Sequence, residues 1–256
     1  MSDVAEPQVN GAAAAPQLPP LYGSIEPLQA ARHASLRIRD MGYGFARNLA
    51  AVPLAAEEFV AASRHLPIVF AAQAPHLPVA LAGLTAERNG FVGEDGAWRR
   101  GAYIPSYLRR YPFLLVRVSN QSDEMALCLD PQAPQLSEEA GEPLFGADGQ
   151  PTEMAKRAFE FTRAVEAAFL KTREMADGLV LMGLLKPAAI QFDRGQGQGP
   201  MRVDGFHAVE RETFNKLSGE QLATLRDKGW LDCIYAHLLS LGGIAEFAQT
   251  GGISQG

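Results

Sequence analysis

The sequence predicts an α+β fold. Its N-terminal half is rich in predicted strands, which form a mixed or antiparallel sheet. Its C-terminal half is rich in helices and returns one or two strands. Three observations support this prediction. Short runs of β-branched and aromatic residues, bounded by turn residues, fill the chain before residue 130. Apolar residues recur at helical spacing after residue 151, and extended patterns return between residues 189 and 213.

Length and composition indicate a globular chain with tails at both ends. Its 256 residues are 47% hydrophobic and 20% charged, which suits a protein with a sizeable core. Residues 1–24 are rich in Ala, Pro, Gln and Gly, so we expect a disordered tail. Residues 25–245 are expected to form a single α+β domain, with residues 130–151 as the best place for a subdivision. Residues 246–256 are expected to form a flexible C-terminal tail.

The N-terminal half begins with an alternating pattern in Leu36–Arg39 that predicts a first strand. A short helix is expected at Phe59–Arg64, because Pro67 limits it. Short apolar runs predict three further strands, and the turn at Glu94–Gly96 predicts a hairpin. The strands are expected at residues 68–71, 78–84 and 90–92, with residues 98–103 as the returning arm of the hairpin.

A short helix and two strands are expected next. Pro105 suits the first position of a helix and Pro112 limits it to about two turns, which places Tyr107 and Tyr111 on one face. Residues 113–118 and 124–129 read as strands joined by the polar turn at residues 120–123.

The C-terminal half is predicted to open with a long helix. Thr152 is its expected cap, and Gly178 is expected to end it after Asp177. Its inward stripe is expected to contain Ala155, Phe159, Thr162, Val165 and Phe169. Residues 179–185 then read as a separate short helix that ends at Pro187.

Strands and two more helices complete the predicted order. Residues 189–193 and 205–213 look extended. Ser218 and Gln221 match a capping box, and Gly229 is expected to end that helix. The last helix is expected at residues 230–241, closed by two glycines, with an inward face of Leu231, Ile234, Leu238 and Leu241.

Charge and hydropathy exclude several classes of function. The formal net charge is −6, which argues against nonspecific binding of nucleic acid. The longest apolar runs fall short of the roughly 20 residues that a membrane span needs. The first basic residue is Arg32, so no signal peptide is recognised and a cytoplasmic location is expected, with signal-independent export left open.

The segment from Trp98 to Phe113, called here the aromatic–arginine segment, is the most unusual part of the chain. Its sixteen residues hold four arginines, three tyrosines, a tryptophan and a phenylalanine. Arginine donates to carboxylate or phosphate through a planar fork, and aromatic rings supply stiff contact area. The predicted ligand-binding or partner-binding residues are Trp98, Arg99, Arg100, Tyr103, Tyr107, Arg109, Arg110 and Tyr111. The alternative is structural: the arginines pair with acids of this chain and the rings pack in the core.

Other candidate sites are weaker. The glycine-rich residues 193–200 lead into Pro200 and not into a helix, so a connection between strands is expected there. The five histidines lie at spacings that match no metal signature, and no metal or cofactor is predicted. Cys128 and Cys233 are isolated and are expected to be buried, reduced thiols.

Several blocks together resemble the bacterial SapC family over roughly residues 25–245. They are LPIVF at residues 66–70, PVAL at 78–81, the aromatic–arginine segment with its YIPSYLRRYPF core, GEPLF at 141–145 and IYAHLLSL at 234–241. The resemblance implies an accessory or binding protein linked to nutrient uptake or to cell-surface systems, and it implies no catalytic residue set.

Three functional hypotheses follow. The first is a non-catalytic protein that binds a small anionic ligand, a glycan or a protein partner through the aromatic–arginine segment. Homo-oligomers are compatible with it. The second is an enzyme whose catalytic groups, drawn from His65, His76, Asp193 and His237, come together only in the fold. The third is a surface-layer component, which the family name implies.

Overall fold

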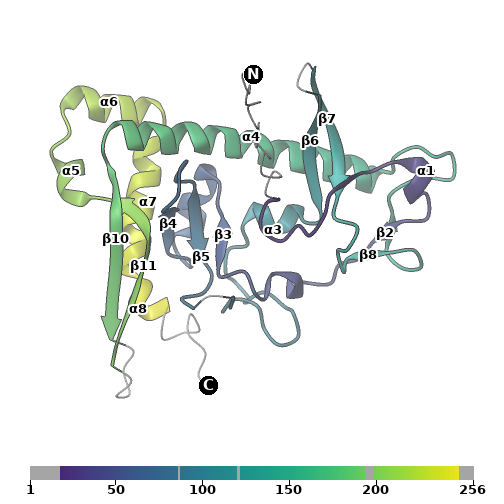
Figure 1. Cartoon of the computed structure of the whole chain (residues 1–256), viewed down its shortest axis with the longest axis horizontal. Helices are drawn as coiled ribbons and strands as arrows, with labels where there is room; N and C mark the ends of the chain where they lie inside the picture. Colours follow the sequence, from purple (N-terminus) through teal and green to yellow (C-terminus); the bar gives the residue numbers. More distant parts are fainter. Residues whose placement is uncertain (1–17, 86, 120–121, 194–198, 248–256) are drawn as a thin grey trace, which may run out of the picture.

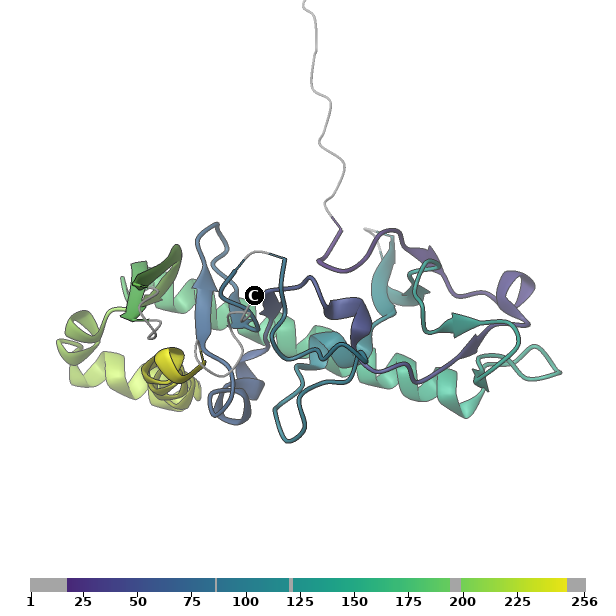
Figure 2. The same ribbon diagram turned by 90° about the horizontal axis from the view of Figure 1, so that it is seen from below.

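The fold is built along one long helix. The computed structural model describes residues 18–85, 87–119, 122–193 and 199–247. Helix α4 (Glu153–Leu181) runs along the long axis of an elongated molecule in both views (Figures 1 and 2). The largest sheet and helices α5–α7 lie toward its C-terminal end, and strands β6 and β7 lie toward its N-terminal end (Figure 1). Within the described residues, none of the helices has the length and apolar character needed to cross a membrane.

The largest sheet has five strands, and all of its strand pairs are antiparallel. Its order is β10 (Leu185–Asp193), β11 (Pro200–Val209), β4 (Ile68–Ala71), β5 (Pro78–Leu81) and β3 (Ala51–Pro53). The C-terminal half therefore returns two strands to the sheet of the N-terminal half. Together with the helices that follow, this arrangement confirms the predicted α+β class.

Two smaller antiparallel sheets complete the strands. One has the order β1 (Glu26–Pro27), β7 (Ser122–Leu129) and β6 (Phe113–Ser119). The other has the order β8 (Leu136–Ser137), β2 (Arg37–Ile38) and β9 (Glu142–Pro143). The connector at residues 130–151 therefore contributes two strands, one on each side of β2.

The remaining helices are short except for α7. They are α1 (Ala30–His33), α2 (Phe59–Ala62), α3 (Ser106–Arg110), α5 (Arg211–Asn215), α6 (Gly219–Asp227), α7 (Trp230–Gly242) and α8 (Ile244–Phe247), with 3-10 turns η1 (Gly44–Ala46) and η2 (Ala56–Glu58). The capping box predicted for α6 is present. The backbone N–H of Gln221 donates to Ser218 Oγ at 3.2 Å, and Gln221 Oε1 accepts from the N–H of Ser218 at 2.9 Å.

Helix α4 joins two clusters of buried apolar residues. Its first turns, with Ala155 and Ala158, pack in a smaller cluster that includes Phe113, Leu129 and Leu144. Its last turns pack in the larger cluster, which also holds the five-stranded sheet and the buried face of α7, through Met175 and Leu179. Of the predicted inward stripe of α4, Ala155, Thr162 and Val165 are buried, whereas Phe159 and Phe169 are half-buried.

Gly178 does not end α4, so this prediction is wrong. A Cβ atom at Gly178 would lie 2.3 Å from Trp230 Cζ3, and the glycine therefore allows α7 to approach α4 closely. The helix ends beyond it, where Gly183 adopts φ +67° and Leu184 N–H donates to Leu179 O. The separate helix predicted for residues 179–185 does not form, because residues 179–181 are the last residues of α4 and β10 begins at Leu185.

Other boundaries also differ from the predictions. The hairpin expected at residues 90–103 is reduced to a single bridge between Val92 and Trp98. Strand β11 ends at Val209, and α5 replaces the extended residues expected up to 213. Pro105 occupies the N-cap position of α3 and is not its first helical residue.

Both ends of the described chain are tied down. Residues 18–24, which the sequence places in a disordered tail, contact the core, since the Tyr22 hydroxyl donates to Phe113 O at 2.7 Å. Phe247, which the sequence places in the C-terminal tail, is buried and stacks on Phe91. The rest of the two predicted tails, residues 1–17 and 248–256, lies outside the described residues.

The buried face of α7 is more polar than predicted. Ile234 is buried as expected, but Leu231, Leu238 and Leu241 are only half-buried. Their place in the core is taken by Trp230, Cys233, Ala236, His237 and Ser240. The helical spacing of the leucines alone had predicted that they form the buried face. His237 and Ser240 are stable in the core because the backbone of the sheet forms hydrogen bonds with their side chains.

Candidate functional site

Most side chains of the aromatic–arginine segment are held by the rest of the chain. Trp98 is buried and stacks on Phe91, with ring centroids 5.2 Å apart and an interplanar angle of 20°. Tyr107 and Tyr111 are also buried, and their hydroxyls donate to Pro20 O and to Asp130 Oδ2. Burial is the main cause that raises the pKa of both tyrosines.

The segment is anchored by one buried carboxylate. Glu58, which is 5% exposed, accepts hydrogen bonds from the Tyr103 hydroxyl at 2.8 Å and from Ser106 N–H at 2.7 Å. It also accepts from Ser106 Oγ at 2.8 Å and from Ala55 N–H at 3.0 Å. Burial and the adjacent charge of Glu58 raise the pKa of Tyr103. Glu58 thus joins the start of α2 to the start of α3.

The four arginines of the segment have different surroundings. Arg110 is 5% exposed, forms an ion pair with Glu166 and lies over the rings of Tyr107 and Phe169 at 4.8 and 5.6 Å. Arg109 is exposed and lies 5.3 Å from the ring centroid of Phe161. Arg99 is half-buried and Arg100 is exposed, and both line a pocket.

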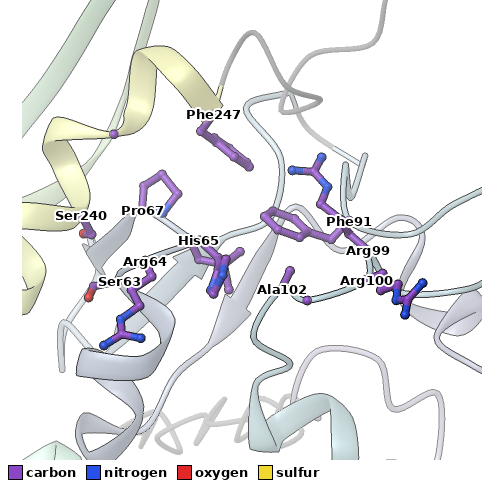
Figure 3. A pocket seen from close by; sticks show the side chains of 13 residues that line it. Ser63, Arg64, His65, Pro67, Phe91, Arg99, Arg100, Ala102, Ser240 and Phe247 are labelled. Atoms are coloured by element: carbon purple, nitrogen blue, oxygen red, sulfur yellow. The ribbon is translucent and has the colours of Figure 1, made fainter.

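This pocket, called here the arginine pocket, has a volume of about 400 Å³. It lies between the loop that follows α2, the start of the aromatic–arginine segment and the end of α7. Figure 3 shows Phe91 and Phe247 close together, with Arg64 and Arg100 on opposite sides of His65. The lining residues are Ser63, Arg64, His65, Leu66, Pro67, Phe91, Arg99, Arg100, Gly101, Ala102, Ser240, Gly243 and Phe247.

The lining of the arginine pocket is cationic although the chain as a whole is acidic. It contains three arginines and one histidine, and none of the described residues that line it is acidic. Arg64 and Arg100 are exposed, and no ion pair joins either of them to another described residue. Arg99 donates to Gly90 O at 3.0 Å and lies 4.4 Å from the ring centroid of Phe91.

An aromatic wall lies beside these cations. The rings of Phe91 and Phe247 stack with centroids 5.6 Å apart and an interplanar angle of 20°. Both rings are buried, so they form the back of the pocket and leave the guanidinium groups as its exposed part. Guanidinium groups bind carboxylate and phosphate through paired hydrogen bonds, so the pocket can contact an anionic group.

The sequence identified only part of this pocket. Arg99 and Arg100 were predicted, whereas Tyr103, Tyr107, Arg109, Arg110 and Tyr111 are not among its lining residues. Trp98 lies behind it, against Phe91. Arg64 and Phe247 were missed, and His65 was named only for the enzyme hypothesis; these lining residues come from two distant parts of the chain. The adjacent Arg64 and His65 between a short helix and a strand were the only local signal.

The histidines considered for catalysis lie in three different surroundings. His65 lines the arginine pocket. His76 packs on His207, with ring centroids 4.5 Å apart, and bonds to Ala71 O at 2.8 Å. His237 is fully buried, accepts from Val209 N–H at 3.0 Å through Nε2 and donates to Ile68 O at 2.8 Å through Nδ1. The side chain of Asp193 lies outside the described side chains.

Metal ligands and thiols are two further kinds of candidate group among the described residues. No three of their His, Cys, Asp or Glu side chains gather in a way that could hold a metal ion. Cys128 and Cys233 are free and buried, as predicted, and burial raises the pKa of both thiols, that of Cys233 to about 11. Of the glycine-rich connection, residues 194–198 lie outside the described part of the chain.

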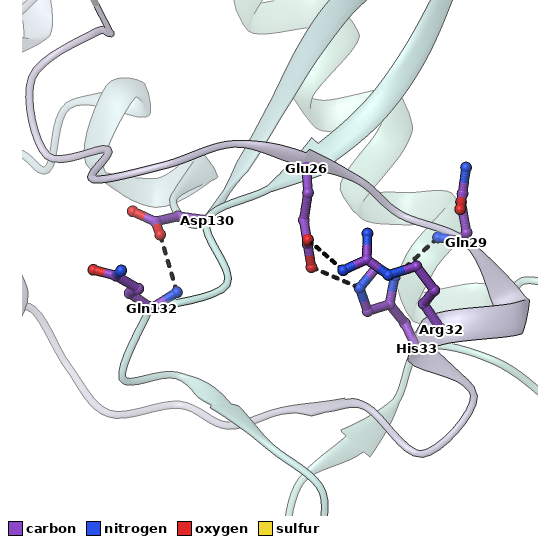
Figure 4. A network of polar contacts seen from close by, with 6 residues as sticks. All are labelled: Glu26, Gln29, Arg32, His33, Asp130 and Gln132. Carbon is purple, nitrogen blue, oxygen red and sulfur yellow. Dashed lines mark hydrogen bonds and ion pairs between the residues drawn. The ribbon is translucent and has the colours of Figure 1, made fainter.

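A polar cluster near the N-terminus has a structural role. Glu26 pairs with His33 Nε2 at 2.9 Å and with Arg32 at 2.8 Å, and Gln29 N–H donates to His33 Nδ1 at 3.0 Å (Figure 4). The hydrogen bond from His33 is the main cause that lowers the pKa of Glu26. The cluster ties α1 to β1.

A second cluster in the same view centres on Asp130, which is 1% exposed. Its carboxylate accepts from Gln132 N–H at 3.0 Å (Figure 4) and from Gly23 N–H at 2.8 Å. With the Tyr111 hydroxyl as a third donor, Asp130 joins residues 18–24 to the end of the aromatic–arginine segment.

Comparisons with known proteins place the chain in one family. No curated protein and no solved structure shows significant similarity to it. A family model described as SapC matches residues 28–247, which cover most of the chain and nearly all of the described fold. The match includes the aromatic–arginine segment and every residue that lines the arginine pocket. The chain therefore belongs to the SapC family.

Proposed function

We propose that the chain is a non-catalytic accessory protein that binds an anionic group in the arginine pocket. One observation carries the proposal. The exposed Arg64 and Arg100 line one pocket beside Arg99, and no ion pair joins Arg64 or Arg100 to another described residue, in a chain whose formal net charge is −6. Like charges gathered in this way repel one another, and a bound anion relieves that repulsion.

The contrast with Arg110 supports this assignment. Arg110 belongs to the same segment but is buried and paired with Glu166, so its charge is already satisfied within the fold. Arg64 and Arg100 are exposed at the pocket and can donate to a ligand. Each charge-assisted hydrogen bond is worth about 1.5–3 kcal/mol, so loss of one such bond weakens binding by about tenfold or more.

Citrate is a suitable first probe, since it carries several carboxylates and fits a pocket of about 400 Å³. Isothermal titration calorimetry of the full chain with citrate is expected to show binding. The double variant Arg64→Ala/Arg100→Ala is expected to weaken it at least tenfold, because two charged donors are lost. Inorganic phosphate serves as a second, smaller probe.

The matched control is Arg109→Ala, which removes an exposed arginine of the same segment that does not line the pocket. Arg109→Ala removes one positive charge, as each pocket substitution does, but it should leave the affinity for citrate within about twofold of that of the wild type. Equal losses in the Arg109 and the pocket variants would mean that only the overall charge matters. Equal affinity in wild type and the double variant would refute the pocket assignment.

A further inference from the structure

A second, apolar groove adjoins the arginine pocket. It has a volume of about 530 Å³ and is called here the α2–α7 groove. Ser63 and Arg64 line both the pocket and the groove, so the two hollows share a wall. The groove is lined by Val60, Ser63, Arg64, Asp232, Tyr235, Ala236 and Leu239.

The apolar side chains of this groove are unusually exposed. Val60 is 55% exposed, Tyr235 is 51% exposed and Leu239 is 74% exposed. Tyr235 and Leu239 are one turn apart on α7, and Val60 faces them from α2. A single exposed apolar residue is ordinary, but several that line one hollow are typical of a contact surface.

The groove and the pocket differ in charge. Asp232 is the acid among the described groove residues, whereas the described residues that line the pocket include Arg99 and Arg100 and no acid. A ligand that fills both hollows must therefore have an acidic part next to an apolar part. A peptide meets this requirement, because it can place carboxylates and large apolar side chains at a spacing of a few residues.

We infer that the ligand of the arginine pocket is a protein segment with acidic residues next to large apolar ones, which lays its apolar side chains in the α2–α7 groove. This inference rests on the proposed function and names the class of partner. Arg64 stands at the junction and contacts the acidic part. Leu239 contacts the apolar part, and its exposed position means that its replacement leaves the core intact.

Fluorescence anisotropy with labelled peptides tests the inference on the full chain. The probe has three glutamates followed by two leucines and a phenylalanine, and a second probe has the reverse order. The control peptides replace the three apolar residues with serines. We expect at least one acidic–apolar probe to bind about tenfold more tightly than its serine control, since partial burial of the apolar side chains in the groove favours binding.

Single variants separate the groove from the pocket. Leu239→Ser is expected to remove most of the advantage of the acidic–apolar probe while citrate still binds. Leu181→Ser is the matched control, because Leu181 is 88% exposed at the end of α4 and does not line the groove. It should change neither affinity. The double variant Arg64→Ala/Arg100→Ala is expected to weaken the binding of the acidic–apolar probe and of its serine control.

Three outcomes would overturn the inference, and they differ in what they say of the pocket. If the apolar and serine peptides bind equally and citrate still depends on Arg64 and Arg100, the peptide partner is wrong and the anion site stands. If neither citrate nor any peptide binds, both fail. If sedimentation shows self-association that Leu239→Ser abolishes, the groove is an interface between copies of this chain.

Discussion

Replacement of Glu58 by alanine is expected to lower the free energy of unfolding by about 4 kcal/mol, measured by urea denaturation. Four donors lose their acceptor, namely the Tyr103 hydroxyl, the Ser106 hydroxyl and the N–H groups of Ser106 and Ala55. Because Glu58 is 5% exposed, water cannot replace the carboxylate without a local rearrangement.

Glu57→Ala is the matched control for this experiment. Glu57 is the preceding residue and has the same side chain, but it is exposed. Its replacement should change the free energy of unfolding by less than about 0.5 kcal/mol. Glu58→Gln keeps the shape but presents an amide N–H₂ to groups that donate, so we expect an intermediate loss. Equal stability of the Glu57 and Glu58 variants would show that the carboxylate does not hold α2 and α3 together.

His237→Ala is expected to lower the free energy of unfolding by about 3 kcal/mol. The change leaves Val209 N–H and Ile68 O without their partners and opens a cavity beside Phe70, whose ring lies edge-on at 5.3 Å. Urea denaturation of this variant beside His65→Ala, which removes an exposed histidine, measures the difference. A loss as small as that of His65→Ala would contradict the role assigned to His237.

Burial of His237 is also expected to make the free energy of unfolding depend on pH. Burial lowers its pKa from 6.5 to about 4, so the folded state takes up the proton less readily than the unfolded state. At pH 7 the folded state is neutral at this residue and the unfolded state is mostly neutral, so the effect is small. As the pH falls from 6.5 to 4, the unfolded state gains the proton first and the free energy of unfolding decreases, by about 3 kcal/mol in all.

The variant His237→Gln isolates this contribution from the carboxylates that titrate in the same range. It cannot take up the proton, so its free energy of unfolding should decrease less than that of the wild type between pH 6.5 and 4. Denaturation at four pH values in this interval gives the two slopes. Parallel slopes would mean that His237 does not titrate on unfolding.

The parts of the fold that were predicted correctly depend on local signals. The capping box at Ser218 and Gln221 and the mostly apolar runs at residues 68–71 and 113–118 each act within a few residues. The failures involve contacts between distant residues. Gly178 reads locally as a helix stop, but the ring of Trp230 arrives from another helix and makes glycine necessary there. Leu238 and Leu241 were predicted to face inward from their helical spacing, but His237 lies inside because β4 and β11 supply its partners.

The candidate site was predicted only in part for the same reason. The composition of the aromatic–arginine segment distinguishes it from the rest of the chain, but composition does not say which arginine meets an acid. Arg110 meets Glu166 because α3 packs on α4, and Arg100 lines a pocket because its loop faces the end of α7. Arg64 and Phe247 complete the pocket from positions far away in sequence.

The most direct test of the central claim is an NMR titration of the side-chain Nε–H signals of arginine with citrate. We predict saturable shifts at Arg64, Arg99 and Arg100, which line the pocket, and no shift at Arg110, which is buried against Glu166. Shifts that are absent from the pocket arginines, or that appear equally at exposed arginines such as Arg109 and Arg163, would contradict an anion site in this pocket.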